Sequence, residues 1–170
     1  ASLGLYFGGL FSGDDKVRVT GRLMGEALFL AGIPAIILQY GLGRSRPYSG
    51  DGPWKYNFFE RSNEKQSLPS GHSAVAFAIS TVLAKRIGRL WASVPLYTMA
   101  GLTALSLGWT GQHWPSDLLI GAAIGYLAGS YVVSREEERS ESGGLTQSGS
   151  EDRFTARIGP GGVSVRYIIF

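Results

Sequence analysis

The residues best suited to chemistry fall into three short clusters, each beside an apolar segment. One histidine, His72, ends the sequence LPSGH (residues 68–72), ahead of an apolar run. The other, His113, lies in GQHWPSD (residues 111–117), ahead of a second apolar run, and the pair Arg46-Pro47 follows a third. The chain has no further histidine. Two histidines, an arginine and a carboxylate together indicate phosphoryl transfer with a histidine nucleophile.

His113 is the candidate nucleophile of the third cluster. A neutral imidazole can attack phosphorus when its other ring nitrogen donates to a carboxylate that fixes the tautomer. Asp117 lies four residues after His113, one helical turn away, and Pro115 favours a helix start at this point. We therefore expect Asp117 to be the partner of His113. The alternative is that the two residues only cap a helix.

His72 is the candidate general acid. It stands at the predicted start of a helix, where free backbone N–H groups and the helix dipole favour an anion. Ser70 can cap this helix and offer its hydroxyl, while Gly71 lets an oxyanion approach the backbone. A histidine at this position can protonate a leaving alkoxide. The alternative is an ordinary helix cap with an incidental histidine.

Arg46 completes the set as a candidate phosphate ligand. It ends the first long apolar segment, and a guanidinium can bind two phosphate oxygens at once. A cation at a helix end also favours the dipole or marks membrane topology. The coincidence with the two histidine clusters favours the phosphate-binding interpretation.

Composition limits the classes of protein that fit. The chain has 170 residues, about one domain, of which 44% are hydrophobic and 25 are glycine, so it is not a disordered protein. It has no cysteine, which excludes disulfides and thiolate ligands. The net charge of +3 is mild, and no stripe of alternating arginines and aromatic residues points to nucleic acid. We therefore expect no nucleic-acid partner.

The distribution of charge predicts an all-α fold, an antiparallel bundle of transmembrane helices. Charged residues concentrate between apolar stretches, which have helical lengths and are rich in Ala, Leu, Ile and Gly; the stretches are residues 23–40, 73–84, 90–109 and 118–133. About 20 residues span a bilayer, so the second and fourth stretches are long enough only with their polar flanks. Frequent small residues suit close helix packing in a membrane. A soluble four-helix bundle is the alternative.

Lysine and arginine predict the orientation in the membrane. Three basic groups fall on one side of four antiparallel spans, which is then cytoplasmic; they are Lys16, Arg18 and Arg22, then Lys85, Arg86 and Arg89, then Arg135 and Arg139. Arg46, His72 and His113 all fall on the other side, so we expect one composite site at the extracytoplasmic face of a bacterial inner membrane. We assign the loop cations Lys55, Arg61 and Lys65 on that face to the site.

The ends of the chain differ from its centre. The chain does not begin with Met, and the apolar residues 2–12 are too short for a span, so we expect helices upstream of Ala1. We take residues 1–134 as a helical membrane domain and the polar, Gly/Ser-rich residues 135–152 as a linker. Residues 153–170 alternate apolar and polar residues around a Gly-Pro-Gly-Gly turn, which predicts a β-hairpin tail.

These motifs resemble the type 2 phosphatidic acid phosphatase family, whose relatives include bacterial acid phosphatases and vanadium haloperoxidases. The family motifs are Lys-x6-Arg-Pro, Pro-Ser-Gly-His and Ser-Arg-x5-His-x3-Asp. This chain has Gln39-x6-Arg46-Pro47, a complete PSGH at residues 69–72, and Ser106-Leu107-x5-His113-x3-Asp117, all within residues 14–134. The resemblance implies that His113 is the nucleophile, Asp117 its partner and His72 the general acid. It also implies that Arg46, Ser70 and Gly71 hold phosphate, with Gln39 in the binding set and no metal or cofactor.

The chain departs from the family pattern at two positions. Gln39 stands where the family has a lysine, and Leu107 stands where it has an arginine. Both family residues are cationic phosphate ligands, and charged hydrogen bonds contribute ~1.5–3 kcal/mol each, so their loss can lower the rate by several powers of ten. Gln39 still donates a neutral hydrogen bond, whereas Leu107 donates none. Arg44, Lys55, Arg61 and Lys65 are candidate replacements.

Three functions are compatible with the sequence. The leading prediction is a metal-independent membrane phosphatase that hydrolyses a lipid phosphate or pyrophosphate through a phosphohistidine intermediate. The second is a catalytically inactive member that binds lipid phosphate or supports a partner, which the two missing cations favour. The third is a vanadate-dependent oxidase, which fits least because holding vanadate makes the fullest use of those cations.

Overall fold

The structure, a computed structural model, describes residue 4 and residues 14–151, 154–159 and 162–167. The chain divides into two compact units, Ala1–Val133 and Ser134–Phe170. The expected helix end at residues 2–12 lies outside the described residues, apart from Gly4. The candidate site lies wholly in the first unit.

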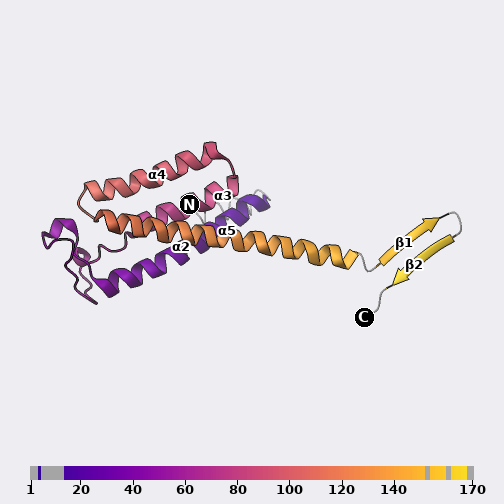
Figure 1. Ribbon diagram of the computed structural model, residues 1–170, viewed down its shortest axis with the longest axis horizontal. Coiled ribbons are helices and arrows are strands. Elements are labelled where there is room, and N and C mark those ends of the chain that lie inside the picture. The colour runs from indigo at the N-terminus through magenta and orange to yellow at the C-terminus, as the bar shows by residue number, and fades with distance from the viewer. Residues whose placement is uncertain (1–3, 5–13, 152–153, 160–161, 168–170) are drawn as a thin grey trace. The chain divides into compact units, whose positions relative to one another are not determined.

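In the described residues of the first unit, the regular elements are helices joined by loops (Figure 1). Helix α2 (Asp15–Leu42) leads through a long loop to α3 (Gly71–Ile87), and α4 (Leu90–Trp109) follows after two residues. A short turn then joins α4 to α5, which begins at Pro115. The short connections make α3, α4 and α5 successive antiparallel neighbours. The α2–α3 loop, which contains the 3₁₀ turns η1 (Pro47–Ser49) and η2 (Asn63–Lys65), and the α4–α5 turn meet at one end of the bundle.

Local signals explain where the helices begin and end. Asp14 caps α2, because its carboxylate accepts hydrogen bonds from the backbone N–H groups of Lys16 and Val17. Gly43 ends α2 in the left-handed conformation with φ +57°. A Cβ at Gly43 would lie 1.7 Å from the carbonyl oxygen of Asn57, so only glycine lets the loop cross here. This crossing starts the path that brings the loop back over the helix ends.

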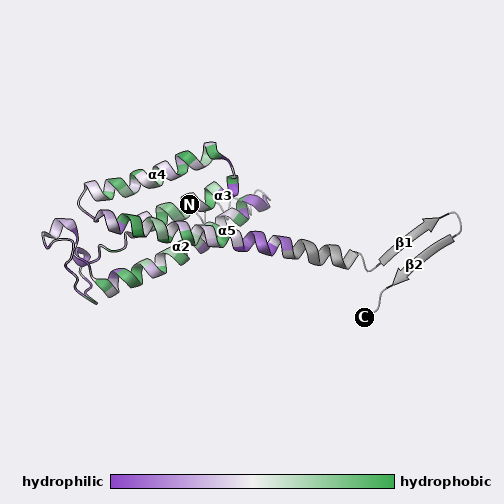
Figure 2. Cartoon of the chain, viewed as in Figure 1, coloured by the Kyte–Doolittle hydropathy of each residue, from purple (hydrophilic) through white to green (hydrophobic). Residues whose placement is uncertain are grey.

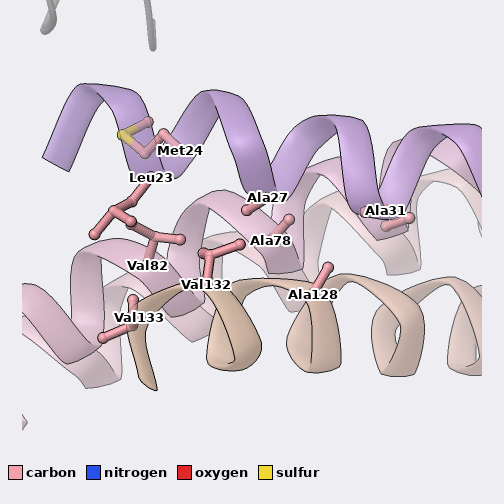
Figure 3. Packing of buried hydrophobic residues seen from close by; sticks show 10 residues of the cluster. Leu23, Met24, Ala27, Ala31, Ala78, Val82, Ala128, Val132 and Val133 are labelled. Carbon is pink, nitrogen blue, oxygen red and sulfur yellow. The ribbon is translucent and has the colours of Figure 1, made fainter. Parts of the chain in front are cut away.

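Helix α3 is the centre of the first unit. Its small side chains pack between α2 and α5 in one hydrophobic cluster (Figure 3); the buried members are Leu23, Met24, Ala27 and Ala31 of α2, Ala74, Ala78 and Val82 of α3, and Ala128, Val132 and Val133 of α5. Alanine predominates, so the helix backbones approach closely, as is typical of membrane bundles. The position of the α3 N-terminus, which carries His72, is fixed by this packing.

A glycine stripe lets α5 lie directly against α3. Gly121, Gly125 and Gly129 recur every four residues and therefore share one face of α5. A Cβ at Gly121 would lie 2.3 Å from the Ser70 carbonyl oxygen, and one at Gly125 would lie 2.1 Å from that of Ala74. No larger side chain fits these positions without moving a backbone. The stripe therefore holds the start of α5, with Asp117, beside the start of α3.

Large apolar side chains are exposed on α2, α4 and α5. Figure 2 shows hydrophobic residues, in green, along these helices. Phe29, Leu105 and Leu119 are 71%, 67% and 72% exposed, which suits contact with lipid rather than water. In the described part of the chain, three helices are long and apolar enough to cross a membrane: Asp15–Leu42, Leu90–Trp109 and Pro115–Glu141. Four spans were expected. Helix α3 does not reach the same length, because it has 17 residues and lies enclosed by the others.

The end of α5 covers the segment expected to be a polar linker. Helix α5 (Pro115–Glu151) continues through most of residues 135–152, and the role of this segment as a linker stays a prediction. Glu and Arg favour helix strongly, and Arg135 pairs with Glu138 one turn on, at 3.3 Å. Strands β1 (Phe154–Gly159) and β2 (Gly162–Tyr167) follow and pair antiparallel. The hairpin stays a prediction, because its turn at residues 160–161 lies outside the described residues.

Candidate active site

A cavity of about 320 Å³ opens at the end of the bundle where the loops meet. Five of the seven residues predicted for the site line it: Gln39, Arg46, Gly71, His72 and His113. The remaining wall is apolar and comes from α2 and α3, through Gly32, Ala35, Ile36 and Val75. Ser70 and Asp117, the other two, are fully buried behind the lining. Residues from three separate clusters therefore face one space with a polar floor and an apolar side.

Arg46 is held in the cavity by two glutamines. Its Nη1 donates to the Gln112 side-chain oxygen at 2.7 Å, and its Nη2 donates to the Gln66 carbonyl oxygen at 3.5 Å. Its Nε is buried and has no hydrogen-bond partner among the described residues. A buried guanidinium N–H without a partner is costly unless a ligand binds it. Arg46 therefore lines the cavity with one guanidinium donor that no described residue satisfies.

The backbone fixes the tautomer of His113. Its Nδ1 lies 2.7 Å from the Ser67 carbonyl oxygen, which can only accept, so Nδ1 carries the proton. In the neutral ring the lone pair is then on Nε2. Burial lowers the pKa of His113 below its ordinary value of 6.5, while the Ser67 carbonyl raises it. Arg46 and His72 lower the pKa further and Asp117 raises it, so the ring is held neutral, as a nucleophile requires.

Asp117 organises the same region from behind the cavity. Its fully buried carboxylate forms an ion pair with Arg44, and it accepts hydrogen bonds from the Ser67 hydroxyl and the Trp114 N–H. No direct hydrogen bond joins it to His113 in this structure; Ser67 stands between the two, bonded to each. Asp117 thus reaches the histidine through Ser67 and through its charge.

The start of α3 places His72 and Gly71 on the cavity wall. Ser70 caps the helix, because its hydroxyl oxygen accepts from the Ser73 N–H at 3.4 Å, and its own N–H donates to the Asp117 carbonyl at 2.9 Å. The Ser70 side chain is fully buried and caps the helix, and its contact with phosphate stays a prediction. The helix N-terminus itself still faces the cavity through Gly71 and His72.

The two positions that lack the family cations lie differently in the structure. Gln39 lines the cavity, and its Nε2 donates to the Pro69 carbonyl at 2.7 Å. Leu107 does not line it; its carbonyl accepts from the N–H groups of Gln112 and His113. Leu107 therefore shapes the turn that carries the nucleophile, while Gln39 offers an amide where the family has an ammonium.

Of the four candidate replacement cations, one lies next to the cavity. Arg44 forms an ion pair with Asp117, and Lys65 forms one with Asp51 at 3.0 Å. Lys55 is exposed and lines neither this cavity nor the one beside it. Arg61 lines a second cavity, which shares Ile36 and Gln39 with the first.

Three features of the site were not predicted from the sequence. They are the contacts of Ser67, the contact of Gln112, and the structural role of Arg44. Ser67 acts through its backbone carbonyl, which every residue type has, so its sequence gives no signal. Gln112 directly precedes His113, and a polar amide beside a nucleophile is a usable hint. The sequence identifies Arg44 as a cation, but nothing in it distinguishes the role of Arg44 from that of Arg46.

Comparisons with known proteins identify the superfamily of the chain. Residues 21–140 match the PAP2 superfamily, and because this is more than half of the chain, the chain belongs to that superfamily. Over 93 residues it is 40% identical to the lipid A 1-phosphatase of Porphyromonas gingivalis. The matched residues make up 54% of this chain and 18% of that relative. The chain thus spans less than a fifth of the relative's length. The crystal structure of Aquifex aeolicus LpxE matches with a TM-score of 0.61 at 26% identity, covering 78% of this chain and 75% of that one.

Proposed function

We propose that the chain is a membrane phosphatase that hydrolyses a lipid phosphate or pyrophosphate monoester through a phosphohistidine at His113. The observation that carries the proposal is the hydrogen bond from Nδ1 of His113 to the Ser67 carbonyl, at 2.7 Å. It leaves Nε2 of a neutral, buried imidazole as the nucleophilic atom, in a cavity that also holds Arg46 and His72. This arrangement has the parts needed for nucleophilic phosphoryl transfer.

The proposed reaction has two steps. Nε2 of His113 attacks phosphorus, the bond from phosphorus to the leaving oxygen breaks, and His72 donates a proton to that oxygen. Water then attacks the phosphohistidine, His72 takes a proton from the water, and inorganic phosphate leaves with His113 restored. Arg46 and the start of α3, at Gly71, stabilise the charge on the equatorial oxygens. Asp117 stabilises the positive charge that develops on His113. No metal is required by these steps.

A lipid substrate follows from the walls of the cavity and from the relatives. The polar floor suits a phosphate, and the apolar α2 and α3 wall borders the faces that expose large hydrophobic side chains, so an acyl or isoprenoid chain can remain in the bilayer. The Porphyromonas relative is named for lipid A 1-phosphate. The basic residues at the opposite end of the bundle, Lys16 and Arg86 among them, support a cytoplasmic side there. We place the site at the extracytoplasmic face of a bacterial inner membrane.

The second candidate is an inactive member of the same superfamily that only binds lipid phosphate. It is favoured by Gln39 and Leu107, which bring no positive charge to the cavity. It keeps the anion site at Arg46 but lacks turnover. The two candidates differ in whether phosphate is ever transferred to His113.

Single-turnover trapping separates these candidates. The purified full chain is mixed in detergent micelles with ³²P-labelled lipid phosphates and quenched in base, because phosphohistidine is labile in acid and stable in base. The panel is phosphatidic acid, phosphatidylglycerol phosphate, undecaprenyl pyrophosphate and lipid A. Base-stable label on the parent protein, and none on His113→Ala, supports the phosphatase. Binding of a lipid without label and without phosphate release supports the inactive member.

A further inference from the structure

A second cavity, of about 400 Å³, lies beside the candidate active site. Ile36, Gln39, Tyr40, Arg61 and Gln66 line it, and Ile36 and Gln39 belong to both cavities. Gln66 also links them, because its carbonyl accepts from Arg46 Nη2. A molecule whose phosphoryl group lies against Arg46 and His113 therefore has room to extend past Gln39 toward Arg61. The headgroup space is larger than a single phosphate needs.

Arg61 is held at this cavity by the C-terminal end of α2. Its guanidinium carbon lies over the Tyr40 ring, 5.6 Å from the ring centre. The loop before it is anchored on the same residue, because the Phe59 N–H donates to the Tyr40 carbonyl at 3.1 Å and the two rings meet edge to face at 5.9 Å. Phe59 has φ +61°, a conformation that is unfavourable for a bulky residue and recurs at functional sites. These contacts place Arg61, an exposed residue, beside the ring of Tyr40.

The charge of Arg61 is available to a ligand. Arg44 and Lys65 each have a carboxylate partner, whereas no carboxylate pairs with Arg61 among the residues that the structure describes. A guanidinium that stacks on an aromatic ring by its face keeps the N–H donors along its edge. Those donors suit the planar, two-oxygen contact that a phosphate offers. Gln39 and Gln66 add neutral polar groups beside it.

We propose that Arg61, with Gln39 and Gln66, forms a second anion-binding subsite that holds a phosphate group of the lipid headgroup other than the one that reacts. This inference rests on the proposed function. It makes Arg61 a specificity-determining residue, which favours headgroups with two phosphates over those with one. It also explains how a site without the family lysine at position 39 recovers positive charge for binding.

The test compares two lipids with the same acyl chains. Phosphatidic acid has one phosphate, whereas phosphatidylglycerol phosphate has a terminal phosphate monoester and a second phosphate within the headgroup. The full chain is assayed in detergent micelles as the parent, Arg61→Gln, Arg61→Lys and the matched control Lys55→Gln. Lys55 belongs to the same loop and is exposed, but it lines neither cavity. Phosphate release gives kcat and KM for each lipid.

We expect Arg61→Gln to lower kcat/KM for phosphatidylglycerol phosphate about tenfold more than for phosphatidic acid, mainly through KM. Arg61→Lys should recover part of the loss, and Lys55→Gln should not discriminate between the lipids. An equal loss on both lipids, or no loss, overturns the subsite. A parent that releases phosphate from neither of these lipids, nor from undecaprenyl pyrophosphate or lipid A, contradicts the proposed function instead. The subsite is then tested by measuring the dissociation constants of the two lipids by calorimetry. An about tenfold greater loss of affinity for phosphatidylglycerol phosphate than for phosphatidic acid in Arg61→Gln supports the subsite, and equal losses overturn it.

Discussion

The Nδ1 atom of His113 lies 2.7 Å from the carbonyl oxygen of Ser67, and the Ser67 hydroxyl donates to Asp117. One serine therefore contacts the predicted nucleophile through its backbone and the predicted partner carboxylate through its side chain. Arg44 neutralises that carboxylate on its far side. The chain Arg44–Asp117–Ser67–His113 connects the loop after α2 with the start of α5, so the orientation of the imidazole depends on both.

The first prediction concerns pH. Burial lowers the pKa of His113 below 6.5, and the ring must be neutral to attack, so activity is present above the lowered pKa and is lost as pH falls through it. The acid limb of kcat/KM should therefore lie below pH 6.5. Histidine NMR of the micelle-bound chain should show the same pKa, and Arg46→Gln should raise it, since the Arg46 charge lowers it. A His113 that titrates above 6.5 contradicts this electrostatic account.

The second prediction separates the two histidines by role. His113→Ala and His72→Ala should each abolish phosphate release from a lipid, while circular dichroism shows an unchanged helix content. With p-nitrophenyl phosphate, whose leaving group needs no proton, His72→Ala should recover part of its activity and His113→Ala should recover none. Unchanged lipid turnover in either variant would refute the mechanism. Equal recovery in both variants would contradict the assignment of His113 as the nucleophile and His72 as the general acid.

The third prediction tests the buried pair. Asp117→Ala leaves the Arg44 guanidinium buried without its partner, and breaking such a pair costs about 3–5 kcal/mol, so the thermal midpoint in micelles should fall strongly and activity should be lost. Asp51→Ala is the matched control, because it removes the carboxylate of the more exposed pair with Lys65. A pair near the surface contributes little to stability, so its loss should shift the midpoint far less. Equal thermal shifts would mean that Asp117 does not organise the site.

The fourth prediction concerns the contact between α3 and α5. A Cβ at Gly125 would lie 2.1 Å from the Ala74 carbonyl oxygen, so Gly125→Ala forces the helices apart and should cost about 1–3 kcal/mol of stability. Gly101→Ala on α4 is the control, because a Cβ there meets nothing within 4 Å. Alanine favours helix over glycine by about 1 kcal/mol, so this control should be neutral or stabilising. Thermal unfolding followed by intrinsic fluorescence measures both; an equally tolerated Gly125→Ala would contradict the packing.

The sequence was sufficient to predict the helical bundle and the meeting of Arg46, His72 and His113. Helices that alternate in direction bring every second connection to the same end, so counting apolar segments places all three clusters together. The partner of His113 could not be predicted, because a backbone carbonyl has no sequence signature. The different roles of Arg44 and Arg46 could not be predicted either, because both are arginines and they stand two residues apart. Arg44 pairs with Asp117, whereas Arg46 lines the cavity. The length of α5 could not be predicted, because the Glu and Arg before residue 140 favour helix whereas the Gly and Ser after it do not.

The last prediction concerns the missing cations. Phosphoryl transfer spreads negative charge over the equatorial oxygens, and donors fixed near them supply much of the catalysis. Gln39 lines the cavity, so Gln39→Lys should raise kcat/KM, by about tenfold for one charge-assisted hydrogen bond. Leu107→Arg alone should do less, because Leu107 lies outside the lining, and the double variant should exceed either single one.

Stability is measured beside kinetics in this last test, because each new cation near the membrane is costly without a phosphate partner. Gln39→Met is the control, since it removes the hydrogen bond to Pro69 and adds no charge. It should lower activity if the amide already contacts phosphate. A well-folded double variant no faster than the parent would mean that Arg46 and Arg61 already supply the charge that the reaction needs, or that the chain binds lipid phosphate without turning it over. Trapping of phosphate on His113 in the same double variant decides between these two, because only a phosphatase forms the phosphohistidine.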